Sequence, residues 1–347
     1  MKMSSRKDNN FSFLHWMGLA LVIMGHQYSL LGQGSPKMLN VEFHYLGVRI
    51  LFVVSGYLIT ESYKRTKGVG KFIKKRLIRI LPGLAINTLG ILILGTLFTN
   101  LPLQEYVKGI RRYLRNILLC PIFDMPGVFT NNPYPVAING SLWTLPIEVA
   151  CYLLLPFIGL AVVAFQKRSR RMADCFVVLL TIGAYVLYSV TELGIWGEQI
   201  VFWGTDWRRA WVLVVYFALG CVFSYFNLSD KVHFQYAIPI VIFYMFVPAL
   251  AATLLRPLVV AYFTIALAYD APAKLGKICE KCHWYYAGYL WSFPIQQCVI
   301  DIILVRKQIY FHPFYFFVIS FVITFVVAWI VTKWLEDPIV KKLNAVF

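Results

Sequence analysis

The stretch FLHWMGLALVIMGHQYSLLG, Phe13 to Gly32, has the length of a membrane-spanning helix, yet it contains His15 and His26. A helix needs about 20 mostly apolar residues to cross the hydrocarbon core of a bilayer. The two histidines are eleven positions apart, which is about three helical turns, so both imidazoles are expected on one face, roughly 16 Å apart along the axis. Ionisable side chains inside a membrane are costly, and this face is therefore the first candidate for a functional site.

The composition of the whole chain is that of a protein embedded in a membrane. Its 347 residues are 59% hydrophobic, 17% aromatic and only 14% charged, and apolar runs of span length recur along the sequence. We therefore predict an all-α, polytopic helical membrane protein, a single domain over residues 1–347 with no appended soluble domain. About ten transmembrane helices are expected, at residues 11–31, 41–62, 80–99, 141–165, 173–193, 209–227, 234–250, 253–270, 284–305 and 313–335.

The distribution of charge predicts the orientation of these helices. The chain has 33 Lys and Arg residues against 16 Asp and Glu, a net charge of +17. Most of the cations fall in segments on the same side as the N-terminus, and cytoplasmic segments of membrane proteins are rich in Lys and Arg. An even number of spans then puts both termini in the cytoplasm. Nucleic acid is not expected as a partner, because a basic membrane face suits anionic lipid or an anionic cytosolic ligand.

Glu148 is the expected partner of His26. In SLWTLPIEVACYLLLP its helix begins near Ser141 at the outer face, so its carboxylate is expected roughly 10 Å inward. His26 is expected at a similar depth, where a carboxylate can hold an imidazole in one tautomer and stabilise its protonated form. The alternative is a structural carboxylate, for example paired with Arg49. That arginine lies mid-span in LGVRILFVVSGYLIT and must contact an acid or line a wet cavity.

A basic ridge opens the third span. In KKRLIRILP, Lys75 and Arg79 are four residues apart and share one helical face, beside Arg76. Basic residues at an inner helix end are common as topology determinants, but such a ridge also suits phosphate groups, to which Arg offers a bidentate fork. His15, about one turn from the inner end of the first span, is either an interfacial residue or a functional one.

Further candidates lie on the second span. Ser55 and Gly56 are small and permit the close approach of another helix or of a slender ligand. Glu42 and His44 enter this span from outside, where they are either wet interface residues or contacts for a polar acceptor.

Three other features have a structural interpretation as well as a functional one. Trp143 and Tyr57 either pack against neighbours or line a channel and stack on a sugar. Cys279-Glu-Lys-Cys282-His283 matches the pattern of covalent haem attachment. This motif is expected in a cytoplasmic loop with no further ligands nearby in sequence, so neither haem nor a metal site is predicted.

Six segments occur in a specific order from the first span to the last: FLHWMGLALVIMG, LFVVSGYLIT, KKRLIRILP, SLWTLPIEVACYLLLP, GYLWSFPIQQ and KWLEDPIVKKL. Together they resemble the acyltransferase 3 family of integral membrane acyltransferases. The signature of that family in the first span is Arg or Lys, ten intervening residues and His. Here the His is His26, and His15 stands at the basic position.

The resemblance implies an enzyme of the bacterial inner membrane that moves an acyl group, most often acetyl, from cytosolic acetyl-CoA to a hydroxyl of a cell-envelope glycan or lipid-linked saccharide. His26 would be the general base, and Glu148 would orient its ring. The donor acetyl-CoA would contact His15, Lys75, Arg76, Arg79, Ser55, Gly56 and Tyr57. The acceptor would contact Glu42, His44, Arg49 and Trp143.

The main alternative is a multi-pass transporter or flippase of a glycan or lipid intermediate. It would need no acyl donor and should show weak symmetry between its two halves, which is not evident here. A purely structural membrane subunit would leave His26 and Glu148 at matching depth without a reason.

Overall fold

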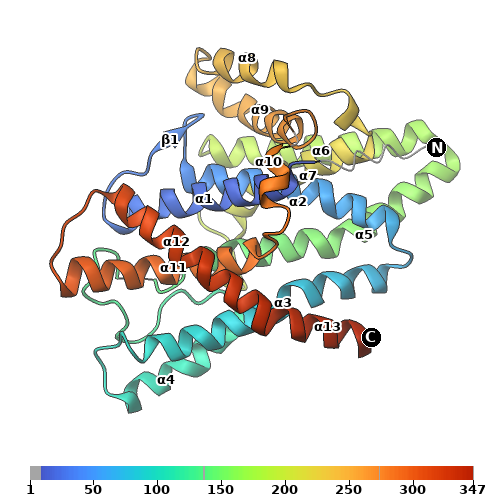
Figure 1. Ribbon diagram of the computed structural model, residues 1–347. Coiled ribbons are helices and arrows are strands. Elements are labelled where there is room, and N and C mark those ends of the chain that lie inside the picture. Colours follow the sequence, from blue (N-terminus) through green and yellow to red (C-terminus); the bar gives the residue numbers. More distant parts are fainter. Residues whose placement is uncertain (1–8, 136, 273, 347) are drawn as a thin grey trace.

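The computed structural model describes residues 9–135, 137–272 and 274–346, and over these ranges the chain folds into a helical bundle with two short β-hairpins (Figure 1). The elements are α1 (Phe11–Leu30), β1 (Lys37–Met38), β2 (Val41–Glu42), α2 (Phe43–Arg65), α3 (Val69–Gly95), α4 (Leu103–Tyr113), α5 (Leu145–Arg168), α6 (Arg170–Glu192), β3 (Val201–Phe202), β4 (Thr205–Asp206), α7 (Trp207–Tyr225), α8 (Phe234–Tyr244), α9 (Ala249–Tyr269), α10 (Lys274–Cys279), α11 (Tyr285–Ile300), α12 (Pro313–Val331) and α13 (Asp337–Val346). Short 3-10 turns precede α5 (Gly140–Thr144) and follow α4 (Leu114–Leu118) and α7 (Leu228–Asp230), and π-helical turns follow α11 (Asp301–Arg306) and α12 (Thr332–Glu336).

Eight of the described helical segments are long and apolar enough to cross a membrane: Phe43–Arg65, Val69–Gly95, Gly140–Arg168, Arg170–Glu192, Trp207–Tyr225, Ala249–Tyr269, Tyr285–Arg306 and Pro313–Ala345. The chain is thus a multi-pass integral membrane protein, as the composition predicts. Helix α1, with 20 residues that include two histidines and Gln27, is not among these eight.

The expected span over residues 234–250 is wrong. Helix α8 has only 11 residues, about 16 Å of rise, whereas the hydrocarbon core is about 30 Å thick. A proline disfavours the helical conformation of the residue before it. Here Pro248 follows Val247 and is the N-cap residue of α9. The apolar stretch is therefore broken into one short helix and the beginning of the next.

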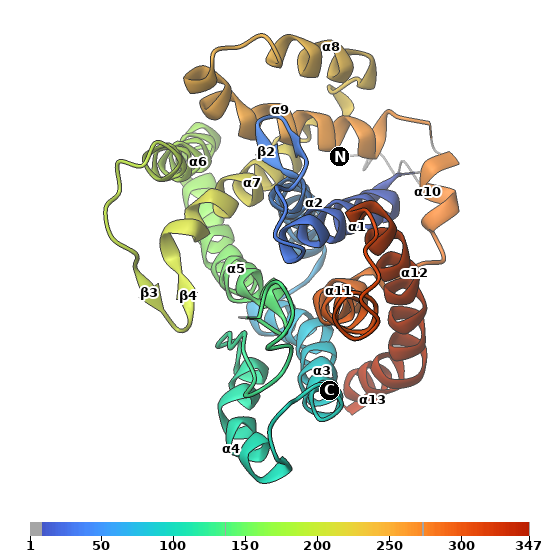
Figure 2. The ribbon, with the colours of Figure 1, turned by 90° about the vertical axis from the view of Figure 1, so that its left-hand side faces the viewer.

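Helices α1 and α2 lie near the middle of the bundle when it is viewed along the helices (Figure 2). Helix α2 packs against α1 on one side and against α7 on the other. Both crossings need glycine, because a Cβ at Gly56 would overlap the carbonyl oxygen of Phe217 in α7, and a Cβ at Gly25 would overlap the backbone nitrogen of His44. Small residues of this kind let helix backbones approach closely in membranes.

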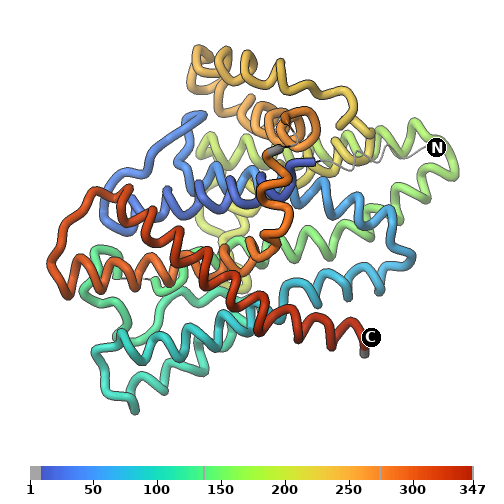
Figure 3. The backbone as a smooth tube through the Cα atoms, viewed as in Figure 1, coloured from blue at the N-terminus to red at the C-terminus, as the bar shows by residue number. Residues whose placement is uncertain are grey.

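The two ends of the bundle differ in character. The turns after α2 and α5 and the end of α13 lie together on the right in Figure 3, and these segments carry many of the Lys and Arg residues. At the other end, two hairpins lead directly into α2 and α7. Both turn through two residues with positive φ, Leu39 and Asn40 in one, and Trp203 and Gly204 in the other, as tight hairpin turns require.

Candidate active site

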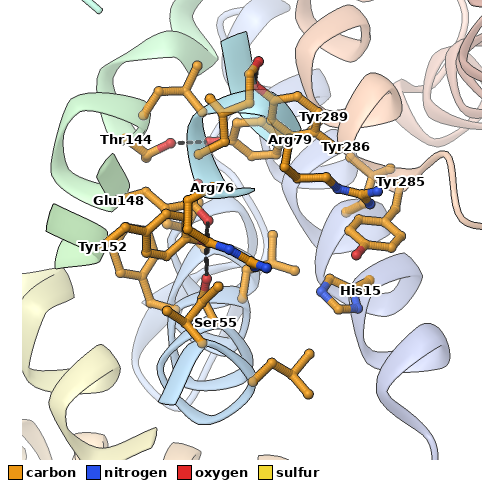
Figure 4. Close-up of a pocket in the computed structure, with 18 residues that line it drawn as sticks. His15, Ser55, Arg76, Arg79, Thr144, Glu148, Tyr152, Tyr285, Tyr286 and Tyr289 are labelled. Carbon is orange, nitrogen blue, oxygen red and sulfur yellow. Dashed lines mark hydrogen bonds between the residues drawn. The ribbon is translucent and has the colours of Figure 1, made fainter. Parts of the chain in front are cut away.

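A cavity of about 180 Å³, here called the central cavity, lies between α1, α2, α3, α5 and α11 (Figure 4). Sequence-predicted residues from four different helices meet in it: His15, Ser55, Arg76, Arg79 and Glu148. Its remaining polar lining consists of Thr144, Tyr152, Tyr285, Tyr286 and Tyr289. The cavity is otherwise walled by aliphatic and aromatic side chains, and pockets of this make-up, with a few convergent polar groups, are typical of binding sites for small molecules.

Glu148 is held at the cavity wall by two hydroxyl groups. Ser55 Oγ donates to Glu148 Oε1 at 3.1 Å, and Tyr152 OH donates to the same oxygen. The two hydroxyls also contact one another at 2.6 Å. Tyr152 follows Glu148 by four residues on α5, which places both side chains on one helical face. The arrangement fixes the carboxylate against α2.

Two arginines of α3 extend into the central cavity (Figure 4). Arg76 Nη2 donates to Ser62 Oγ at 3.3 Å, and its guanidinium lies 5.9 Å from the ring centroid of Phe72. Among the described residues, the buried Nε of Arg76 has no hydrogen-bond acceptor. Buried polar groups normally find partners, so this donor is suited to a ligand in the cavity.

His15 closes the opposite side of the central cavity. Its Nδ1 lies 2.7 Å from the carbonyl oxygen of Phe11, and its ring stacks on Tyr285 with 3.9 Å between centroids. Because a carbonyl oxygen only accepts hydrogen bonds, Nδ1 carries the proton, and Nε2 of the neutral ring is left as an acceptor. His15 therefore lines the site without needing a charge.

His26 lies outside the central cavity, near the hairpin end of α1. Leu19, which lines the cavity, precedes His26 by seven residues, about 10 Å along the helix. The ring of His26 stacks on His44 with 4.8 Å between centroids and contacts the edge of Phe293 at 5.3 Å. His44 Nε2 in turn lies 3.3 Å from Glu42 Oε2. The expected Glu148 partner is thus replaced by His44 and, behind it, Glu42.

A second cavity, of about 480 Å³, lies at the mouth of both hairpins and is here called the hairpin cavity. The predicted acceptor-side residues Glu42, Arg49 and Trp143 line it, together with Lys37, Tyr45, Glu192, Trp196, Arg208, Arg209 and Arg256. Trp143 faces this cavity, whereas the next residue, Thr144, faces the central one. The same holds for Arg49 and Val48 of α2, so the two cavities share these walls.

A third cavity, of about 550 Å³, adjoins the turn between α2 and α3 and is here called the basic cavity. It is lined by Arg65, Thr66, Lys67, Lys71, Lys74, Lys75, Ile78 and Asn344. Lys75 and Ile78 face this cavity from α3, while Arg76 and Arg79 face the central cavity from the adjacent side of the same helix. The cationic ridge expected from the sequence therefore divides between two neighbouring cavities.

Two predicted contacts of the donor lie elsewhere. Gly56 faces the backbone of Phe217 in α7 and not a cavity. The ring of Tyr57 packs between those of Phe11 and Tyr269, with 5.5 Å between centroids in each pair. In the structure both residues take part in the packing of α2. Packing is the second interpretation that the sequence offered for a small residue and an aromatic one.

Other residues of the cavities were not expected. Tyr152 has a signal in the sequence, since it stands one turn after Glu148 on the same face. Glu192 has a weaker one. A buried Arg49 requires an acid, but only the fold, which brings the end of α6 to Arg49 and Arg256, reveals that the acid is the last residue of α6. The three tyrosines of α11 that line the central cavity look like ordinary aromatic content in the sequence.

The chain is similar to known acyltransferases. A family described as an acyltransferase domain matches residues 10–276. An O-acetyl transferase of Shigella phage Sf6 is 26% identical over 316 residues, 85% of this chain and 86% of the phage protein. Nodulation protein 10 of Rhizobium leguminosarum bv. viciae is 30% identical over 206 residues, 54% of each chain.

The O-acetyltransferase OatA of Staphylococcus aureus (strain NCTC 8325 / PS 47) is 25% identical over 347 residues, 86% of this chain and 53% of that protein. The chain thus spans about half the length of the rhizobial and staphylococcal proteins. No solved structure gives a significant match.

Proposed function

Because the chain belongs to the acyltransferase 3 family of membrane acyltransferases, we propose that it transfers an acetyl group from acetyl-CoA to a hydroxyl of a cell-envelope glycan or lipid-linked saccharide. The acetyl group is suggested by the names of two relatives, an O-acetyl transferase and an O-acetyltransferase. These relatives come from bacteria and a bacteriophage, which favours a bacterial inner membrane. The basic end of the bundle would then face the cytoplasm.

The observation that carries this proposal is the row of three cavities along the bundle. The basic cavity offers five Lys and Arg side chains at its rim, which suits the phosphates of a coenzyme A nucleotide. The central cavity continues beside it with Arg76, Arg79 and a mostly apolar lining, which suits a slender pantetheine arm. The hairpin cavity opens at the opposite end, where a saccharide would enter.

The proposed chemistry uses His26 as a general base. An acyl thioester supplies the acetyl group. His26 accepts the proton of the acceptor hydroxyl, whose oxygen forms the new ester bond as the C–S bond of the thioester breaks, and the thiolate leaves. The carboxylate of Glu42, which pairs with His44 behind His26, would offset the positive charge that develops on the ring of His26. Glu148, held by Ser55 and Tyr152, would contact the arm in the central cavity, and the thioester at the end of the arm would extend beyond it to His26.

Replacing Lys71 and Lys75 together by glutamine tests the donor half of this proposal. Both line the basic cavity, so their loss should raise KM for acetyl-CoA at least tenfold while leaving kcat within a factor of two, since losing even one hydrogen bond to a charged group costs about 1.5–3 kcal/mol. The assay follows radiolabelled acetyl from acetyl-CoA into purified envelope glycan.

The matched control is Lys167→Gln with Arg168→Gln, in the last turn of α5, outside the basic cavity. If the control pair raises KM as much as the test pair, the basic cavity is not the nucleotide site. If the wild-type protein transfers no label to any glycan fraction, the proposed activity itself fails.

A further inference from the structure

The hairpin cavity has an excess of positive charge. Five Lys and Arg residues line it against two carboxylates: Lys37, Arg49, Arg208, Arg209 and Arg256 against Glu42 and Glu192. Glu42 is already engaged, because its Oε2 lies 3.3 Å from Nε2 of His44. A cavity lined by one sign of charge raises the local concentration of ligands of the opposite sign.

The most buried charges of this cavity belong to a group of three side chains from three helices. Glu192 of α6 accepts from Arg49 Nη2 of α2 at 2.9 Å and from Arg256 Nη1 of α9 at 2.8 Å. Each arginine is only 4% exposed. One carboxylate therefore balances two buried guanidinium groups, and a buried charge without a counter-charge is costly.

Arg49 also has hydrogen-bond donors to spare. Among the described residues, its Nε and Nη1 atoms have no acceptor. Arg256 differs, because its Nε donates to the carbonyl of Leu39 at 3.1 Å and its Nη2 to Thr253 Oγ1 at 3.3 Å. Buried donors are nearly always satisfied in proteins, so two unsatisfied donors at the wall of an open cavity indicate a ligand that accepts hydrogen bonds.

At the rim of the cavity, too, the cations outnumber the carboxylates. Arg208 and Arg209 both approach Asp206 Oδ2, at 3.6 and 3.7 Å, so the five cations around this cavity face three carboxylates, Glu42, Glu192 and Asp206. Lys37, on the first hairpin, is one of these five cations. Arginine is the side chain best suited to bind carboxylate or phosphate oxygens in pairs.

The cavity also offers flat apolar surfaces. Tyr45, Trp143 and Trp196 line it, and aromatic side chains combine an apolar face with a polar edge, which suits the ring of a sugar. Its volume of about 480 Å³ lies within the range of about 300–1,000 Å³ that is usual for small-molecule pockets. Through Glu42 and His44 its wall reaches His26.

Resting on the proposed function, we propose that the acceptor is an anionic saccharide whose carboxylate or phosphate binds the guanidinium groups of the hairpin cavity. The anionic group of the acceptor completes the charge balance of Arg49 and Arg256 and accepts from the unsatisfied donors of Arg49. A neutral saccharide of the same size leaves this buried excess charge in place and binds more weakly.

A binding experiment on the purified full chain in nanodiscs of phosphatidylcholine tests this proposal without any acyl donor. The probes are trigalacturonate, its fully methyl-esterified neutral form, and N-acetylglucosamine 1-phosphate. We expect at least one anionic probe to bind wild type tenfold or more tightly than the neutral ester, with the difference shrinking as salt is raised. Preference for trigalacturonate assigns a carboxylate acceptor, and preference for the sugar phosphate assigns a phosphate.

Substitutions locate the binding to this cavity. Arg49→Gln removes the unsatisfied donors, and Lys37→Gln with Arg209→Gln changes only the rim, where the Arg209 side chain is 58% exposed and folding is not at risk. Each variant is expected to lower the affinity for the anionic probe at least fivefold. Arg112→Gln, whose side chain is 62% exposed and pairs with Asp124, is the control and should bind as wild type does.

Equal affinity for acidic and neutral probes, binding of neither anionic probe, or unchanged affinity in the rim variant overturns the proposal. The binding assay needs no acetyl-CoA. A negative binding result therefore does not change the outcome of the transfer assay, and a negative transfer assay does not change the binding result.

Discussion

Replacing His26 by alanine is expected to lower kcat for acetyl transfer by about 10²–10⁴-fold, the usual contribution of a general base. The ring that stacks on His26, that of His44, is paired with Glu42, so the loss measured in His26→Ala is what remains after any contribution from this second imidazole. The measurement is the initial rate of label transfer from acetyl-CoA to glycan at saturating concentrations of both. Thermal unfolding of the variant, measured in parallel, separates loss of chemistry from loss of fold.

His233→Ala is the matched control for this change. Its side chain is 48% exposed, lies just before α8, and lines none of the three cavities. Its rate should stay within a factor of two of wild type. A His26→Ala protein that transfers acetyl at the wild-type rate would remove this imidazole from the mechanism.

Replacing Glu192 by alanine is expected to cost about 3 kcal/mol or more of folding stability. Removing one partner of a buried ion pair typically costs about 3–5 kcal/mol, because the remaining charge is left uncompensated. Here a single carboxylate serves two arginines and connects α2, α6 and α9. Thermal unfolding in detergent should show a transition well below that of wild type.

Asp124→Ala provides the comparison. Asp124 pairs with Arg112 at the surface, where both side chains are about half exposed or more, and exposed ion pairs contribute only about 0–1 kcal/mol. Equal melting temperatures for the two variants would mean that Glu192 does not balance the buried arginines. A large loss confined to Glu192→Ala would support the charge accounting on which the anionic-acceptor proposal depends.

The sequence predicts the membrane class well because apolar length is a local property. A run of some 20 apolar residues can only be a span or a buried helix, and eight of the described helices meet that criterion. Helix α8 is too short to meet this criterion, and the reason is also local, since Pro248 interrupts an otherwise apolar stretch. The hairpins before α2 and α7 are harder to foresee, because their turns place Leu39 and Trp203 at positive φ, where Asn or Gly is usual.

The site is predicted less completely, for a geometric reason. Counting residues from the end of a span gives the depth of a side chain, but it says nothing about the direction in which the side chain points. Glu148 and His26 were expected to meet because their depths match, yet Glu148 faces Ser55 and Tyr152 while His26 faces His44. Pairs one helical turn apart are visible in the sequence, whereas partners on different helices, such as Arg49 and Glu192, depend on packing.

The sidedness of transfer in sealed bacterial membrane vesicles tests whether acetyl passes through the protein from the basic end to the hairpin end. Radiolabelled acetyl-CoA, which does not cross membranes, is added outside everted and right-side-out vesicles that contain the protein. We expect labelled glycan inside the everted vesicles, whose cytoplasmic face meets the donor, and none from sealed right-side-out vesicles. Equal labelling from right-side-out vesicles would contradict it.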